Sequence, residues 1–131
     1  MSNFKLSKRS LGRLQDVNSL LIAIVVDGIK ESPYDFGIPQ HGGKRTQDEQ
    51  NLLFKQVPKI TNADGFKKKS YHQSGNAFDI YAYVDGKASW DVKYLEPIAR
   101  HLQEIATEKY NIDLTWGGDF RSFKDMPHFQ I

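Results

Sequence analysis

The sequence contains no cysteine, and this absence constrains the fold more than any other single feature. Disulfide bridges and thiolate metal clusters are excluded, so a stable fold has to rest on a buried hydrophobic core. Any metal ion has to bind histidine or carboxylate side chains. With 131 residues, the chain is long enough to bury such a core. We therefore expect a single domain over residues 1–131.

The charge of the chain argues against a nucleic-acid partner. Lysine and arginine number 18 against 16 aspartates and glutamates, which gives a formal net charge of +2 at pH 7. The one cationic run, Lys67–Lys69, is typical of a solvated loop. The most hydrophobic stretch, Leu20–Val26, is far shorter than the roughly 20 residues that cross a bilayer. It also lacks the flanking pattern of a signal peptide, so we expect neither stable membrane association nor an export signal.

Two long segments have the apolar spacing of amphipathic helices. The first extends from Ser10, a residue suited to the N-cap position, to about Lys30. The second covers Val92–Tyr110. It requires either a start close to Pro97 or a kink there, because proline lacks the amide hydrogen that a helix interior uses. Each helix is expected to bury one apolar side.

A shorter helix is expected to begin near Thr46. Thr46 and Glu49 have the spacing of a capping box, in which a hydroxyl and a carboxylate satisfy free amides reciprocally. The buried side of this helix is predicted to consist of Leu52, Leu53 and Phe54. The polar segment that follows, Gln56 to Tyr71, contains Pro58 and is predicted to be a long loop.

Four further segments are predicted to be strands. Apolar residues alternate along Phe78–Val84, which is the pattern of a strand with one buried face, and Asp85-Gly86 is a turn signal that ends it. Shorter strands are expected over Asp35–Pro39, Asp113–Trp116 and Pro127–Ile131. Together these elements predict an α+β fold with a small, mainly antiparallel sheet and flanking helices.

Three side chains have the chemistry to bind one metal ion: His72, Asp79 and His128. A catalytic zinc ion takes three protein ligands and keeps a fourth position for water. Seven extended residues span roughly 23 Å, so His72 and Asp79 can share an ion only if the chain folds back between them. The segment Ser74-Gly75-Asn76 has the turn chemistry for that reversal.

Side-chain alternation gives an independent indication for two of these ligands. Asp79 points away from the apolar residues of its strand, and His128 points away from Phe129 and Ile131 in the last strand. If the two strands are neighbours, Asp79 and His128 share the polar face while the apolar side chains share the core. Taken alone, however, each histidine is more often a surface or hydrogen-bonded residue than a ligand.

The residues around these ligands resemble a known family. The pattern Ser-x-His-x-x-Gly-x-Ala-x-Asp covers Ser70–Asp79, and Asp125 stands three residues before His128. Both motifs resemble the zinc peptidases of the D-alanyl-D-alanine carboxypeptidase and dipeptidase type, a group that includes the phage L-alanyl-D-glutamate endolysins. The resemblance implies the fold that these peptidases share with hedgehog signalling domains.

Two further segments extend the resemblance over about Phe36 to Ile131. Gly43–Gln50 is similar to the Arg-Thr-x-x-Glu-Gln helix start of the family, and Trp116–Phe120 precedes the C-terminal motif. Many carboxypeptidase members carry glutamate where this chain has Asp125. This difference makes the chain more similar to the endolysin branch.

The resemblance implies roles for individual residues. Zinc is the implied cofactor, with the three ligands named above. Asp125 is implied to accept the proton of a water molecule that zinc activates, with Arg45 helping to stabilise the oxyanion. The implied substrate-binding residues are Ser70, Trp116 and Asp119. A core position for Trp116 and a salt bridge within its helix for Arg45 remain open alternatives.

The implied substrate is the stem peptide of bacterial peptidoglycan, cut between L-alanine and D-glutamate. A D-alanyl-D-alanine carboxypeptidase or dipeptidase is one alternative, and a catalytically inactive, zinc-bearing binding module is another. We expect a monomer without a separate cell-wall-binding domain. Without an export signal, the enzyme is expected to accumulate in the host cytoplasm and to reach the wall through a membrane lesion made by another protein.

Overall fold

Four α-helices and three short 3-10 helices are present in the structure, a computed structural model that describes residues 3–56 and 61–131. The α-helices are α1 (Lys8–Arg13), α2 (Ser19–Gly28), α3 (Gln47–Phe54) and α4 (Val92–Tyr110). The 3-10 helices are η1 (Ile29–Glu31), η2 (Tyr71–Ser74) and η3 (Gly117–Asp119). Across the described residues, no helix combines the length and hydrophobicity needed to cross a membrane.

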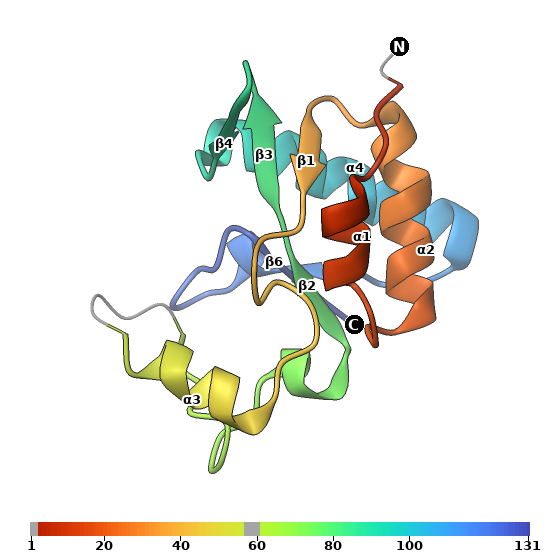
Figure 1. Cartoon of the computed structure of the whole chain (residues 1–131). Coiled ribbons are helices and arrows are strands. Elements are labelled where there is room, and N and C mark those ends of the chain that lie inside the picture. The colour runs from red at the N-terminus through yellow and green to blue at the C-terminus, as the bar shows by residue number, and fades with distance from the viewer. Residues whose placement is uncertain (1–2, 57–60) are drawn as a thin grey trace.

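The strands form two small antiparallel sheets. One has the order β1 (Asp35–Gly37), β3 (Tyr81–Val84), β4 (Lys87–Ser89). The other has the order β2 (Ala77–Asp79), β6 (His128–Gln130), β5 (Thr115–Trp116). In Figure 1, α1 and α2 lie to the right of the sheets, α4 lies behind them and α3 lies apart at the lower left. The predicted α+β class is confirmed.

The predicted strand Phe78–Val84 is present, but the two sheets share it. β2 and β3 are separated at Ile80, whose amide donates to the carbonyl of Pro127 at 3.0 Å. Phe78, Ile80 and Ala82 are fully buried, which confirms the predicted alternation. One extended segment therefore crosses the molecule and carries Asp79 at the junction of the two sheets.

A tight hairpin follows this segment, where the turn was predicted. Asp85 and Gly86 have φ values of 53° and 77°, the left-handed conformation that a two-residue hairpin loop requires. The hairpin pairs Val84 with Lys87. Its second strand, β4, was not predicted, because Lys87–Ser89 is short and has no buried residue to mark it.

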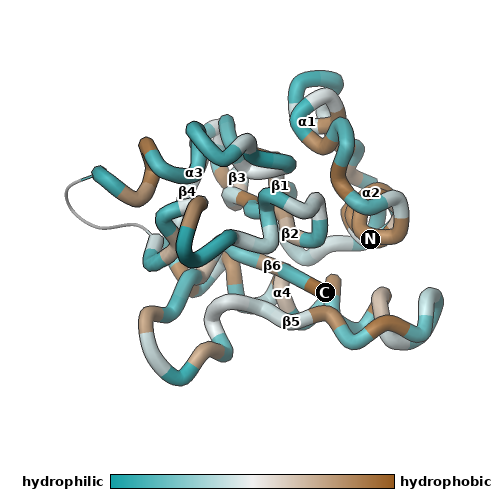
Figure 2. The backbone as a smooth tube through the Cα atoms, turned by 90° about the horizontal axis from the view of Figure 1, so that it is seen from below, coloured by the Kyte–Doolittle hydropathy of each residue, from teal (hydrophilic) through white to brown (hydrophobic). Residues whose placement is uncertain are grey.

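The hydrophobic core lies between α2, α4 and the sheets. α2 packs against α4, and Figure 2 shows hydrophobic residues concentrated along α2. Phe78 of β2 and Phe129 of β6 stack in this core with ring centroids 5.0 Å apart. The bounds of α4 agree with the predicted range, and Pro97 lies within its second turn.

The single helix predicted over residues 10–30 is wrong, because a turn divides it into α1 and α2. Asp16 adopts a left-handed conformation, with φ of 68°, between the two helices. Asn18 caps α2 with its side chain and donates its backbone amide to the carbonyl of Gly75 at 2.8 Å. α1 also begins earlier than predicted, with Ser7 as its cap. A contact with a distant segment therefore overrides the local apolar spacing.

The predicted capping box of α3 is confirmed, but its predicted buried side is wrong at Leu52, whereas Leu53 and Phe54 are partly buried. The Glu49 amide donates to the Thr46 hydroxyl at 3.1 Å, and the Thr46 amide donates to the Glu49 carboxylate at 2.9 Å. Leu52, however, is 66% exposed, while Gln50 is fully buried. α3 therefore turns a polar side chain towards the interior.

The loop predicted between Gln56 and Tyr71 is confirmed for residues 61–70, which contain no helix or strand. The predicted position of Pro58 lies outside the described residues. The loop is tied to α3, since the Asn51 side chain donates to the carbonyl of Asp64 at 2.9 Å. This hydrogen bond holds the loop against α3.

Candidate metal centre

The pairing of β2 with β6 brings two of the predicted ligands together. Asp79 lies directly opposite His128 in the antiparallel register. Their neighbours Phe78 and Phe129 are also paired and are buried in the core. The expectation that Asp79 and His128 share one face of neighbouring strands is confirmed.

His72 reaches the same face from η2. The Ser70 hydroxyl caps this helix by accepting the amide hydrogen of His72 at 3.2 Å. η2 ends at Gly75, whose φ of 79° is the left-handed conformation that favours glycine. The predicted chain reversal at residues 74–76 is therefore present, and it returns the chain from His72 to Asp79.

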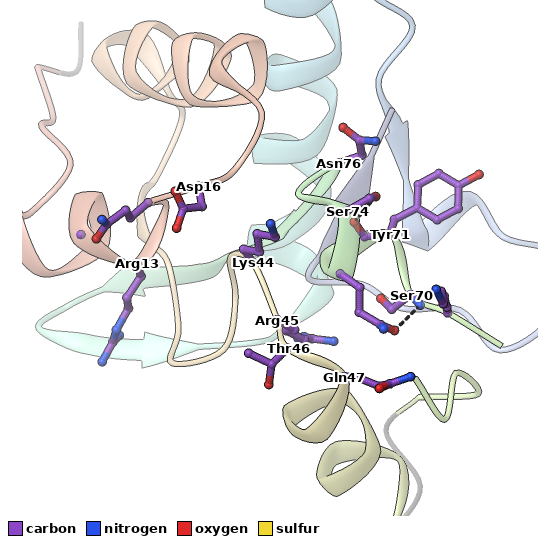
Figure 3. A pocket seen from close by; sticks show the side chains of 14 residues that line it. Arg13, Asp16, Lys44, Arg45, Thr46, Gln47, Ser70, Tyr71, Ser74 and Asn76 are labelled. Carbon is purple, nitrogen blue, oxygen red and sulfur yellow. Dashed lines mark hydrogen bonds between the residues drawn. The ribbon is translucent and has the colours of Figure 1, made fainter. Parts of the chain in front are cut away.

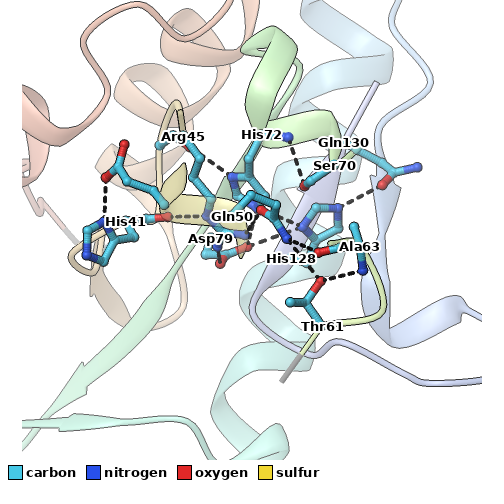
Figure 4. A network of polar contacts seen from close by, with 12 residues as sticks. His41, Arg45, Gln50, Thr61, Ala63, Ser70, His72, Asp79, His128 and Gln130 are labelled. Atoms are coloured by element: carbon cyan, nitrogen blue, oxygen red, sulfur yellow. Dashed lines mark hydrogen bonds and ion pairs between the residues drawn. The ribbon is translucent and has the colours of Figure 1, made fainter. Parts of the chain in front are cut away.

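The three ligand atoms form a nearly equilateral triangle (Figure 4). His72 Nε2 lies 3.1 Å from both Asp79 Oδ1 and His128 Nδ1, and the latter two atoms are 3.3 Å apart. A tetrahedral ion with bonds of about 2.0–2.1 Å has neighbouring ligand atoms about 3.3 Å apart. The three side chains therefore have the spacing of one face of such a tetrahedron.

The outer hydrogen bonds of the two histidines direct their lone pairs into this triangle. The ring of His72 donates from Nδ1 to the carbonyl of Gly43 at 2.9 Å, and a carbonyl can only accept. His128 Nε2 lies 2.7 Å from the side-chain oxygen of Gln130. The inner nitrogens and the Asp79 carboxylate thus face one another, an arrangement that requires a proton or a metal ion between them.

The electrostatics of the cluster agree with a site for positive charge. Burial opposes ionisation of Asp79. The pKa of its carboxyl nevertheless lies well below the ordinary value, because the charges of His72 and Arg45 and hydrogen bonds from both histidines favour the carboxylate. Burial also opposes protonation of His128, but the hydrogen bond with Asp79 and the negative charge of Asp79 raise the pKa of the His128 imidazole. The site therefore retains a carboxylate and attracts a cation.

Arg45 contacts the outer oxygen of Asp79. Its Nη2 donates to Asp79 Oδ2 at 3.0 Å, with side-chain exposures of 10% and 15%. Its Nε donates to the carbonyl of His41 at 2.7 Å. The alternative of a salt bridge within the helix of Arg45 is wrong, because its ionic partner lies on β2. Arg45 instead fixes the orientation of Asp79 and leaves Oδ1 directed at the two histidines.

Gln50 completes this support, although no role was predicted for it. Its side-chain oxygen accepts from Arg45 Nη1 at 3.0 Å, and its amide nitrogen donates to the carbonyl of Ala63 at 2.8 Å. The residue belongs to the Arg-Thr-x-x-Glu-Gln motif. This motif, in which Gln50 directly follows the capping-box residue Glu49, was the signal that could have found it.

A pocket of about 530 Å³ opens over the cluster. Asp125, Arg45 and Ser70 line it together with the three candidate ligands. Its apolar lining includes Leu53, Tyr71, Trp90, Phe120 and Phe123. Six of the eight residues predicted for the site therefore meet in one pocket.

Asp125 is held in this pocket by the backbone. Its amide donates to the carbonyl of Gly117 at 3.0 Å, and its own carbonyl accepts the amide of His128 at 3.1 Å. Burial and the negative charge of Asp79 raise the pKa of the Asp125 carboxyl to about 6. A carboxyl with such a pKa can accept and return a proton near neutral pH.

This raised pKa predicts that Asp125→Asn stabilises the metal-free protein at neutral pH. The folded state has to ionise Asp125 against a pKa of about 6, whereas the unfolded chain has the ordinary 3.8. Ionisation of Asp125 therefore lowers the free energy of unfolding of the wild type. This loss is absent below pH 3.8, grows as the pH rises and is complete above about 6, where it is at most about 3 kcal/mol. Urea unfolding in chelator should show the gain at pH 7.5 and none at pH 3.5; equal stabilities at both pH values would contradict the assigned environment.

The position of Trp116 gives no support to the substrate contact that the resemblance implied. Its side chain is 2% exposed and does not line the pocket. The indole nitrogen donates to the carbonyl of Met126 at 2.7 Å, and the Arg100 guanidinium lies 4.9 Å from the ring. The open alternative of a core position is therefore correct, and Trp116 supports the segment between Asp125 and His128.

Asp119 also lies away from the pocket. Its carboxylate accepts two hydrogen bonds from Arg100 of α4, at 2.8 and 2.9 Å. Hydrogen bonds from Arg100 hold the pKa of the Asp119 carboxyl below its ordinary value. This geometry gives no support to the implied substrate contact of Asp119, and the residue ties η3 to α4 at the surface.

Comparison with known proteins relates this site to a family. The family model described as phage L-alanyl-D-glutamate peptidase matches residues 1–129. The chain is 30% identical over 126 residues to the L-alanyl-D-glutamate peptidase of Escherichia phage T5, which covers 94% of this chain and 86% of that protein. It is 32% identical over 97 residues to the peptidoglycan L-alanyl-D-glutamate endopeptidase CwlK of Bacillus subtilis (strain 168), covering 68% of this chain and 57% of CwlK.

A solved structure shares the whole architecture. The crystal structure of the L-Ala D-Glu endopeptidase ChiX of Serratia marcescens superposes with a TM-score of 0.81 and 27% sequence identity. The match covers 98% of this chain and 90% of ChiX. The fold, the pocket and the sequence matches agree, and the chain belongs to the phage L-alanyl-D-glutamate peptidase family.

Proposed function

We propose that this protein is a zinc-dependent endopeptidase that hydrolyses the bond between L-alanine and D-glutamate in the stem peptide of bacterial peptidoglycan. The observation that carries the proposal is the convergence of His72 Nε2, Asp79 Oδ1 and His128 Nδ1 within one pocket that also contains Asp125. The names of the relatives supply the bond, since each is a peptidase or endopeptidase for L-alanyl-D-glutamate.

The donor set supports zinc. Two imidazoles and one carboxylate, with no fourth ligating side chain in the cluster formed by the described residues, match the ligand number of a catalytic zinc ion. When bound, zinc supplies a Lewis acid that activates water and polarises the peptide carbonyl. Gly43, Gln130 and Arg45 hold the three ligands from outside, as outer hydrogen bonds do in metal sites.

Asp125 is assigned as the general base and acid. Its carboxylate accepts a proton from the attacking water, and the resulting carboxylic acid donates that proton to the departing amine of D-glutamate. Burial and the charge of Asp79, which together raise the pKa of the Asp125 carboxyl, suit both steps. Arg45 positions Asp79 through the hydrogen bond to Oδ2, while its implied contact with the oxyanion stays a prediction.

Digestion of purified peptidoglycan tests the function directly. Intact wall material is incubated with the protein, with and without a chelator, and the new termini are identified by mass spectrometry. We expect L-alanine carboxyl termini and D-glutamate amino termini that disappear with chelator and return with added zinc. Release of free D-alanine would favour the carboxypeptidase alternative, and no cleavage in the presence of zinc would favour the inactive binding module.

Gly43→Ala is predicted to weaken metal binding without touching a ligand. A methyl group at this position would collide with the carbonyl of Arg13, so the carbonyl that holds His72 has to move. Loss of such an outer contact lowers metal affinity by about 10-fold to 100-fold. Competitive zinc titration measures the change, with Gly12→Ala as the control, because a methyl group at Gly12 meets no atom within 4 Å. Equal affinities of the two variants would contradict the role of Gly43.

Three expectations from the sequence remain predictions. These are the single domain over residues 1–131, the monomeric state, and the route to the wall through a membrane lesion made by another protein.

A further inference from the structure

A second, larger pocket adjoins the candidate metal centre. It has a volume of about 1010 Å³ and is hereafter called the lateral groove. Four residues line both pockets: Arg45, Lys69, Ser70 and Tyr71. In Figure 3, Arg13 and Asp16 lie on one side of the groove, Lys44 in the middle, and Ser70 and Tyr71 on the other side. A peptide that crosses Ser70 and Tyr71 can therefore occupy both pockets.

The lateral groove carries an excess of positive charge. Besides Arg45, its lining includes Arg13, Lys44 and Lys69, against the single carboxylate of Asp16. Arg45 is paired with Asp79. In the described part of the chain, no carboxylate lies within ion-pair distance of Arg13, Lys44 or Lys69. Lys44 and Lys69 are thus available to an anionic ligand, whereas the Arg13 guanidinium also donates to the carbonyl of Ile38 at 2.9 Å.

The chemistry of the cleaved bond is asymmetric. L-Alanine contributes a methyl side chain to one side, whereas D-glutamate has two carboxyl groups, of which at most one is linked onward. An unamidated stem peptide therefore carries negative charge on the D-glutamate side of the bond. The pocket over the metal centre is less cationic, because Asp79 and Asp125 stand against its lysine and arginine side chains. Its lining also includes the aromatic side chains of Trp90, Phe120 and Phe123.

We propose that the lateral groove binds the free carboxylate of D-glutamate, and so sets the direction in which the stem peptide crosses the metal centre. The inference rests on the proposed function. Lys44 and Lys69 attract the carboxylate, and Arg13 extends the positive surface towards the end of α1. The alanine side of the bond then lies against Trp90, Phe120 and Phe123 in the pocket over the metal centre.

A comparison of two substrates with two proteins tests this assignment. The substrates are purified disaccharide stem-peptide fragments that differ only at the free carboxyl of D-glutamate, which is either a carboxylate or a carboxamide. The double variant Lys44→Gln/Lys69→Gln is compared with the wild type. One exposed ion pair changes affinity by about 1.4-fold to 5-fold, so we expect KM for the carboxylate fragment to rise by about 2-fold to 25-fold, with kcat within about twofold.

For the carboxamide fragment, the same variant should change KM by less than about twofold. Lys67→Gln is the matched control, because Lys67 is exposed in the same loop but lines neither pocket. Raising the salt concentration should raise KM of the wild type for the carboxylate fragment and should affect the double variant less.

Three outcomes separate the inference from the function on which it rests. A rise in KM that is specific to the carboxylate fragment supports the groove assignment. Equal effects on both fragments, or no effect, would overturn the assignment while leaving the endopeptidase intact. If the wild type cleaves neither fragment with zinc present, the proposed function itself fails.

Discussion

Replacing Asp125 with asparagine will lower kcat for peptidoglycan hydrolysis by about 10²-fold to 10⁴-fold, the range that a general base contributes. The amide keeps the size of the side chain and the backbone contacts to Gly117 and His128. It cannot accept a proton from water or return one to the leaving amine. The measurement is the rate of appearance of new amino termini from wall fragments at saturating zinc.

The metal content of this variant distinguishes loss of the base from loss of the site. Asp125 is not among the three clustered ligands, so Asp125→Asn should still bind one zinc ion per chain. Asp119→Asn is the matched control, because Asp119 is an exposed carboxylate nearby whose partner is Arg100. It should retain hydrolysis within about twofold. Normal turnover by Asp125→Asn would remove the assignment of the base.

Replacing His72 with alanine will abolish tight zinc binding and, with it, hydrolysis. Loss of an outer hydrogen bond to a ligand costs about 10-fold to 100-fold in metal affinity, so loss of a ligand should cost more than 100-fold. At a zinc concentration that barely saturates the wild type, hydrolysis should then fall with the fraction of the variant that still holds zinc. Calorimetric zinc titration and the wall-fragment assay measure the two effects on the same preparation.

His41→Asn controls for a general effect of removing a histidine. His41 is paired with Glu49 at the surface, and its φ of 61° is one that asparagine tolerates. This variant should bind zinc as the wild type does. If His72→Ala retained the zinc affinity of the wild type, the ligand set would be wrong.

The sequence predicted the parts of the site that follow from short-range patterns. Alternation along β2 and β6 placed Asp79 and His128 on one face, because period 2 fixes which side chains share a surface. The reversal at Gly75 followed from turn chemistry. The capping box marked the start of α3 beside Arg45 for the same reason.

Features that depend on distant contacts were missed. The break between α1 and α2 is fixed by the hydrogen bond of Asn18 with Gly75, which no local pattern reports. Gln50 is buried because its side-chain amide forms hydrogen bonds with Arg45 and with the carbonyl of Ala63. A prediction of burial from hydrophobicity alone therefore places this polar residue on the surface. For Trp116 the sequence left substrate contact and a core position open, and only the hydrogen bond of its indole nitrogen to the carbonyl of Met126 distinguishes them.

X-ray absorption at the zinc edge of the loaded protein measures the number and kind of ligands around the metal. We expect one zinc ion per chain, with two imidazoles from His72 and His128, one carboxylate from Asp79, and one remaining position filled by water, at about 2.0–2.2 Å. A spectrum with a fourth protein ligand, or with fewer than two imidazoles, would contradict it.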